Sequence, residues 1–140
     1  MKTAKLVLGN VKDTVQSFFS EYNPAPIAAV MCDLDFYSST LDSLNIFEAD
    51  ETFYLPRVYC YFDDTLGGPI ESYNDYIGQR LAINEFNQSH QTKKLGVPYY
   101  LLTQKLVERW YHQIFIYHDF EHSKYNEFVS KEGQKLALRE

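Results

Sequence analysis

Two pairs of aspartates stand at the ends of apolar runs, and their spacing suits acid–base chemistry or cation binding. Asp33 and Asp35 follow one run, and Asp63 and Asp64 follow the next. Side chains two positions apart point to the same side of an extended chain. Carboxylates that lie close together cannot all stay ionised unless a cation sits among them. Oxygen ligands without nearby thiolates favour Mg²⁺, Mn²⁺ or Ca²⁺ over Zn²⁺, so the sequence predicts a divalent-cation site.

The same aspartates also suit a simpler role as caps for the helices that follow each run, since capping carboxylates are common at strand-to-helix turns. Two acidic pairs at two successive strand ends favour a ligand site instead, because open α/β sheets bind ligands beyond the carboxyl ends of their strands. If the two strands are neighbours, all four carboxylates converge there. Tyr37 follows the first pair and is our candidate for a substrate-binding wall of the pocket.

Three histidines form a second group of polar residues, His112, His118 and His122, accompanied by Asp119 and Glu121. Their spacing does not match the usual zinc-ligand patterns, so we interpret them as the polar end of a strand without a ligand role. Motifs for other chemistry are missing from the 140 residues. None of the six glycines forms Gly-x-Gly, and there is no Gly-x-Ser-x-Gly elbow.

Strands and helices are expected to alternate along the chain, and the strand ends place the aspartates. Strands are predicted at 5–8, 27–32, 57–62, 98–103 and 110–118, and helices after the capping pair Asp13 and Gln16, after the N-caps Ser38 to Thr40, over 73–87 and from Ser123. This order predicts a single α/β domain over residues 1–140 with a mostly parallel sheet. The last two strands are joined by about six residues, too few for a crossover, and are expected to form an antiparallel hairpin.

Composition excludes several classes of protein. Hydrophobic residues make up 45% and charged residues 23%, which are proportions of a globular chain and not of a disordered one. The formal net charge of −6 disfavours binding to nucleic acid or to an anionic membrane, and no apolar run reaches the roughly 18 residues that span a bilayer. The start of the chain lacks the apolar core of a signal peptide, and two cysteines are too few for a disulfide framework. We therefore expect a cytoplasmic protein.

Four segments of the chain resemble motifs of one known family, and they occur in the same order. They are the turn at 8–14, the run at 27–40 that contains Asp-Leu-Asp-Phe-Tyr-Ser-Ser-Thr, the strand end at 61–64 and the helix segment at 82–86. Together they resemble the macrocin O-methyltransferase-like group of class I S-adenosylmethionine-dependent methyltransferases. The resemblance covers most of residues 5–118.

The resemblance implies a three-layer Rossmann-like methyltransferase fold with the sheet order 3-2-1-4-5-7-6. This chain would carry the carboxyl-terminal part of that fold. The segment at Leu6 would be strand 3 and the run at 27–32 would be strand 4. Strands 1 and 2, and the glycine-rich cofactor loop between them, are not in the sequence, so no cofactor-binding residue is assigned.

The resemblance also implies roles for the aspartates. A divalent cation, Mg²⁺ or another, would be held by Asp33, Asp63 and Asp64. Asp35 would be the general base that takes the proton of an acceptor hydroxyl. The cofactor would be S-adenosylmethionine, and the acceptor a small molecule or sugar. The implied activity is that of a metal-assisted O-methyltransferase, present here as a fragment or truncated form.

Two other functions stay open at this point. One is a non-catalytic remnant that acts as a self-associating interaction module. The other is a phosphatase of the haloacid dehalogenase type, whose Asp-x-Asp-x-Thr motif fits Asp33 and Asp35. Tyr37 stands at the position of the threonine in that motif, which counts against the phosphatase.

The run at 27–32 carries no charge, and it bears on how copies of the chain would associate. In a truncated fold this strand would have an exposed edge, which is a site for pairing with another chain. We therefore expect the strand at Leu6 to pair directly with it, and the chain to form a homodimer across the remaining apolar surface.

Overall fold

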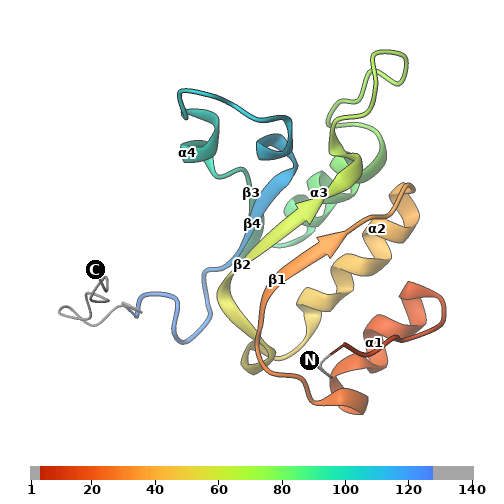
Figure 1. Cartoon of the computed structure of the whole chain (residues 1–140). Coiled ribbons are helices and arrows are strands. Elements are labelled where there is room, and N and C mark those ends of the chain that lie inside the picture. Colours follow the sequence, from red (N-terminus) through yellow and green to blue (C-terminus); the bar gives the residue numbers. More distant parts are fainter. Residues whose placement is uncertain (1–3, 128–140) are drawn as a thin grey trace, which may run out of the picture.

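Helices and strands alternate along the chain, and the protein has an α/β fold (Figure 1). The computed structural model describes residues 4–127. Its elements are α1 (Val11–Tyr22), β1 (Ile27–Cys32), α2 (Tyr37–Leu44), β2 (Tyr54–Phe62), α3 (Gly78–Ser89), β3 (Lys93–Gly96), α4 (Tyr99–Leu102) and β4 (Ile114–Asp119), with short 3₁₀ turns at Asn45–Glu48, Glu51–Phe53, Asp63–Thr65 and Arg109–Gln113. Within the described residues, no helix combines the length and the apolar character needed to cross a membrane.

The four strands form one mixed sheet in the order β1-β2-β4-β3. β1 and β2 are parallel, whereas β4 runs antiparallel to both of its neighbours, so β3 has the same direction as β1 and β2. Two of the three pairings are antiparallel, and the expected mostly parallel sheet is not confirmed. The causes are the position of β4 between β2 and β3 and, within residues 4–127, the lack of a further parallel strand beside β1.

The segment at 5–8 forms no strand, so its predicted pairing with 27–32 is wrong. Leu6 and Leu8 are 83% and 82% exposed, because this short run finds no surface on which to bury its side chains. Asn10 then begins α1, and its side chain accepts a hydrogen bond from the Lys12 backbone N–H at 3.0 Å. This cap replaces the one predicted at Asp13. Within residues 4–127, β1 is therefore an edge strand.

β3 and β4 are antiparallel neighbours, as the hairpin prediction requires, but no short turn joins them. Residues 97–113 connect them and include α4, which lies where the strand 98–103 was predicted. The strand itself lies earlier, at Lys93–Gly96. The sequence pattern did not predict this strand because two of its four residues are lysines. Their amines reach backbone carbonyls instead of water: Lys93 Nζ lies 2.6 Å from the carbonyl oxygen of Phe47, and Lys94 Nζ lies 2.5 Å from that of Asn87.

Two helices begin elsewhere than predicted. α2 begins at Tyr37, before the expected caps, and the hydroxyls of Ser39 and Thr40 donate to the carbonyl oxygen of Phe36, each at 3.0 Å. α3 begins at Gly78 instead of residue 73. The helix predicted from Ser123 has only turns over residues 123–127, and its remainder lies outside the described residues.

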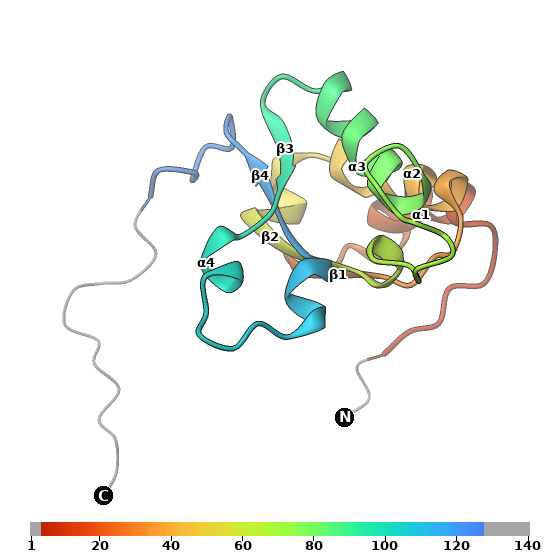
Figure 2. The same ribbon diagram turned by 90° about the horizontal axis from the view of Figure 1, so that it is seen from above.

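Helices α1, α2 and α3 cover one face of the sheet, and the four-residue α4 lies on the other side (Figure 2). Burial along β2 alternates accordingly. Val58 and Phe62 are fully buried toward the three helices, whereas Leu55 and Tyr59, on the opposite face, are 45% and 50% exposed. The expected three-layer arrangement is therefore not confirmed within residues 4–127.

Stacked aromatic rings hold the helical layer on the sheet. Phe47, just after α2, stacks on Tyr117 of β4 with ring centroids 3.9 Å apart and planes 11° apart. Phe86 of α3 and Tyr54 of β2 meet Phe47 edge-on. All four side chains are at most 3% exposed. This cluster joins α3 and the segment after α2 to the two central strands, and so holds the helices against the sheet.

Replacing Phe47 with alanine should lower the free energy of unfolding by about 3–5 kcal/mol, because the change leaves a cavity among the four rings. The matched control is Phe36→Ala, which removes a side chain that is 71% exposed and should change stability by less than about 0.5 kcal/mol. Urea unfolding followed by far-ultraviolet circular dichroism measures both. Equal transition midpoints for the two variants would contradict this packing.

Candidate metal centre

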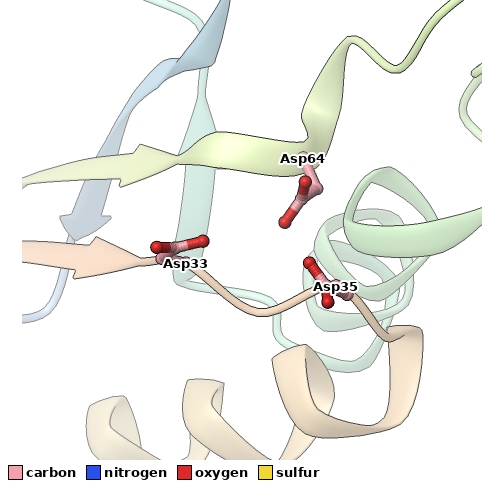
Figure 3. A group of neighbouring side chains, drawn as sticks. All are labelled: Asp33, Asp35 and Asp64. Atoms are coloured by element: carbon pink, nitrogen blue, oxygen red, sulfur yellow. The ribbon is translucent and has the colours of Figure 1, made fainter.

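The carboxyl ends of β1 and β2 bring the predicted aspartates to one edge of the sheet. The two strands are parallel and end in register, with Cys32 opposite Phe62. The chain leaves β1 through Asp33 and Asp35, and it leaves β2 through Asp64. One carboxylate oxygen from each of these three aspartates lies within 4.8 Å of the other two (Figure 3).

The spacing of these oxygens suits a single hard cation. Two ligand oxygens on opposite sides of one ion are about 5 Å apart for Ca²⁺, bound at about 2.3–2.6 Å, and about 4 Å apart for Mg²⁺, bound at about 2.0–2.1 Å. Oxygens that all lie within 4.8 Å of one another are therefore close enough to share one such ion. Three carboxylates leave further coordination positions for water or for the hydroxyl of a ligand.

Asp64 is the most constrained of the three. It lies in the 3₁₀ turn Asp63–Thr65 with φ −97° and ψ 26°, a sparsely populated backbone region. Its Oδ2 atom is shielded from solvent and has no hydrogen-bond partner. Burial raises the pKa of Asp64, and the charges of Asp35, Asp63 and Asp33 raise it further, in that order. The donor set therefore fits a cation, which would give this oxygen a partner and offset the repulsion.

Asp63 faces another way. Its carboxylate accepts a hydrogen bond from the Tyr61 hydroxyl at 2.5 Å, and its backbone carbonyl oxygen accepts one from Gln113 Nε2 at 2.5 Å. The set that the resemblance implied was Asp33, Asp63 and Asp64. The structure groups Asp33 and Asp64 with Asp35 instead, because two consecutive residues at a strand end cannot direct both side chains to the same point.

Tyr37 lies at the start of α2, but its hydroxyl is engaged by the neighbouring helix. It donates a hydrogen bond to the carboxylate of Glu85 on α3. This bond, and slight burial, raise the pKa of Tyr37. The tyrosine that was expected to form a pocket wall therefore ties α2 to α3 behind the aspartates.

The histidines are not gathered into a site. His118 Nδ1 lies 2.8 Å from the Tyr125 hydroxyl, and His122 Nε2 lies 3.1 Å from the carbonyl oxygen of Glu51. His112 lies in the turn before β4. Among residues 4–127, the three aspartates are the one group of at least three acidic, histidine or cysteine side chains with ligand atoms this close.

Gln79 is a residue of the site that the sequence did not indicate. It is fully buried on α3 and donates from Nε2 to the carbonyl oxygens of Cys32 and Leu34. Its Oε1 accepts a hydrogen bond from the Asp64 backbone N–H at 2.9 Å. One feature of the sequence could have indicated Gln79: it is a glutamine on the inward face of a predicted amphipathic helix, one turn before Ala82 and Ile83.

We compared the chain with family models, with curated proteins and with solved structures. Nothing matched. The functional argument therefore rests on the motifs and on the geometry of the three aspartates.

The raised pKa of Asp64 predicts how stability changes with pH. Its folded-state pKa lies above the ordinary value of 3.8, so the unfolded chain loses this proton first as the pH rises. The free energy of unfolding therefore falls between pH 3.8 and the raised pKa, and the loss is complete above that window. In EDTA at pH 7, Asp64→Asn should unfold at a higher urea concentration than the unmodified chain. The gain should vanish well below pH 3.8.

The control for total charge is Asp13→Asn. It removes the same charge from an exposed position in the first turn of α1, where a carboxylate is favourable, and it should not stabilise the chain. A stabilisation by Asp64→Asn that persists unchanged at low pH would contradict the electrostatic explanation.

Proposed function

We propose that this chain forms the cation-binding and acceptor-activating part of a divalent-metal-dependent O-methyltransferase. One observation carries the proposal: two adjacent parallel strands end in register and deliver Asp33, Asp35 and Asp64 to a single point. The motif Asp-Leu-Asp-Phe-Tyr-Ser-Ser-Thr, which carries the family resemblance, contains two of these three carboxylates.

The order of the strands supports the same proposal. The sheet order of the family that the motifs resemble ends in 4-5-7-6. In this chain the order is β1-β2-β4-β3, with the last strand in sequence inserted antiparallel between the second and the third. If β1 corresponds to strand 4, each strand of this sheet has a counterpart in that carboxyl-terminal half.

The proposed chemistry divides the three carboxylates between two tasks. Asp33 and Asp64 would hold the cation, which would lower the pKa of a coordinated acceptor hydroxyl. Asp35 lies within 4.8 Å of both ligand oxygens and would accept the hydroxyl proton. It comes from the loop before α2 and is exposed, so an acceptor can approach it from solvent.

The methyl donor is a separate matter. The 140 residues contain no Gly-x-Gly loop. We therefore assign no residue of this chain to the cofactor and derive no methyl-transfer step from it. The proposal concerns the acceptor side of the reaction only.

Titration calorimetry with Mn²⁺ and Mg²⁺ tests the proposal. The unmodified chain should bind one ion, and Asp64→Asn should weaken binding by about tenfold or more because a ligand charge is lost. Asp63→Asn is the matched control: it removes a neighbouring charge but no ligand oxygen, and it should weaken binding much less than Asp64→Asn. No binding by the unmodified chain, or equal loss in both variants, would overturn the assignment.

The Mn²⁺-loaded chain also tests the acceptor class. Paramagnetic broadening should affect the proton signals of polyhydroxylated small molecules and spare those of their methyl ethers. Hydrolysis of an aryl phosphate that depends on Asp33 would instead support the phosphatase.

A second function, self-association, is favoured by the position of β1. Within residues 4–127 this strand pairs on one side only, and Met31 at its end is 79% exposed. We propose a second copy of the chain as its partner. Two copies related by a two-fold axis would place uncharged residues of 27–32 opposite one another, which avoids like-charge contacts in a chain of net charge −6.

Light scattering tests this pairing. The unmodified chain should have the mass of a dimer at micromolar concentration, and Met31→Lys should shift it to the monomer because a charged side chain on an edge strand opposes pairing with another chain. Ile70→Lys changes a residue that is 94% exposed on a loop and should leave the dimer intact. A monomeric unmodified chain would refute the proposal.

A further inference from the structure

We infer that Gln79 is the positioning residue of the metal centre and that its side chain sets the spacing of Asp33, Asp35 and Asp64. The inference rests on the proposed cation site. Gln79 does not contact the cation position itself. It acts through the backbone of the two segments that carry the aspartates.

The hydrogen bonds of Gln79 lie on both sides of the site. Its Nε2 donates to the carbonyl oxygen of Cys32 at 3.3 Å and to that of Leu34 at 3.1 Å, the two carbonyls that flank Asp33. Its Oε1 accepts from the backbone N–H of Asp64 at 2.9 Å. One side chain therefore connects the end of β1, the loop that leads to Asp35 and the turn after β2.

Only an amide meets all of these demands. Gln79 is fully buried, and both protons of its Nε2 and one lone pair of its Oε1 have partners within the site. A glutamate would lose the donors and add a fourth carboxylate, while a lysine or arginine would lose the acceptor and neutralise the site. An apolar residue would leave the Asp64 N–H without its partner and would remove a donor from each of the two carbonyl oxygens, at a considerable cost in stability.

The surrounding residues support this placement. The Thr40 hydroxyl lies 3.0 Å from the carbonyl oxygen of Phe36 and 3.4 Å from that of Leu34, so α2 contacts the same loop that Gln79 bonds to. Gly78 precedes Gln79 with φ +55°, and a Cβ there would lie 2.9 Å from the Tyr73 ring. A glycine is therefore required for the sharp entry into α3 that directs Gln79 under the strand ends.

Like-charge repulsion gives the consequence of losing Gln79. The three carboxylates repel one another, and the backbone bonds to Gln79 oppose their separation. In Gln79→Met, a variant of similar length and volume, the two segments should move apart. The affinity for Mn²⁺ should then fall by about tenfold to a hundredfold, the effect typical of residues that orient metal ligands.

Asn87→Leu is the matched control. Asn87 lies on the same helix, eight residues further on, and makes an equivalent pair of bonds to the backbone of Leu95, at 2.7 and 2.8 Å. Its loss should destabilise the fold to a similar extent but leave the affinity for Mn²⁺ unchanged. A general weakening of the fold would affect both variants alike.

Calorimetry with Mn²⁺ and hydrogen exchange at the Asp64 amide are the two measurements. If the unmodified chain binds no Mn²⁺, the proposed function fails, and hydrogen exchange still tests the role of Gln79. If it binds Mn²⁺ and Gln79→Met retains the affinity, the role of Gln79 is refuted.

Hydrogen exchange covers the case in which Gln79→Met does not fold. In the unmodified chain the Asp64 amide, bonded to Gln79 Oε1, should be protected from exchange although it lies in a turn. Exchange at the rate of an open loop would equally refute the inference.

Discussion

Electrostatic repulsion among Asp33, Asp35 and Asp64 is the force that the rest of this structure must balance. The three carboxylates come within 4.8 Å of one another, and the pKa of Asp64 is raised by its burial and by its charged neighbours. While they are ionised, these carboxylates are acceptors only and cannot hydrogen-bond to one another. Their arrangement is held from outside, by the register of β1 with β2 and by the amide of Gln79 that bonds to both strand ends.

The helical layer makes that restraint rigid. Gln79 can hold the two strand ends together only because α3 is itself fixed in place. Phe86 fixes α3 by packing edge-on against Phe47, which stacks on Tyr117. The Tyr37 hydroxyl joins α2 to α3 through Glu85. The packing of one face of the sheet therefore determines the geometry at its carboxyl edge, whereas the opposite face leaves Tyr59 half exposed.

Much of this arrangement was predictable from local sequence patterns. The uncharged run 27–32 gave the correct bounds of β1, and the aspartates that follow the apolar runs were placed at the correct edge of the sheet. Local sequence patterns failed to predict the structure where long-range contacts determine it. In the sequence, Lys93 and Lys94 indicate a loop. In the structure, their amines bond to the backbone carbonyl oxygens of Phe47 and Asn87. Gln79 contacts residues more than forty positions away in the sequence. The 3₁₀ turn Asp63–Thr65 determines whether Asp63 or Asp64 faces the site.

The position of the cation is the central claim, and anomalous scattering from a crystal soaked in Mn²⁺ tests it most directly. The account predicts one strong anomalous peak among the carboxylates of Asp33, Asp35 and Asp64, within bonding distance of the Asp64 oxygen that has no other partner. A strong peak at Asp63, or density without any peak among the three carboxylates, would contradict it.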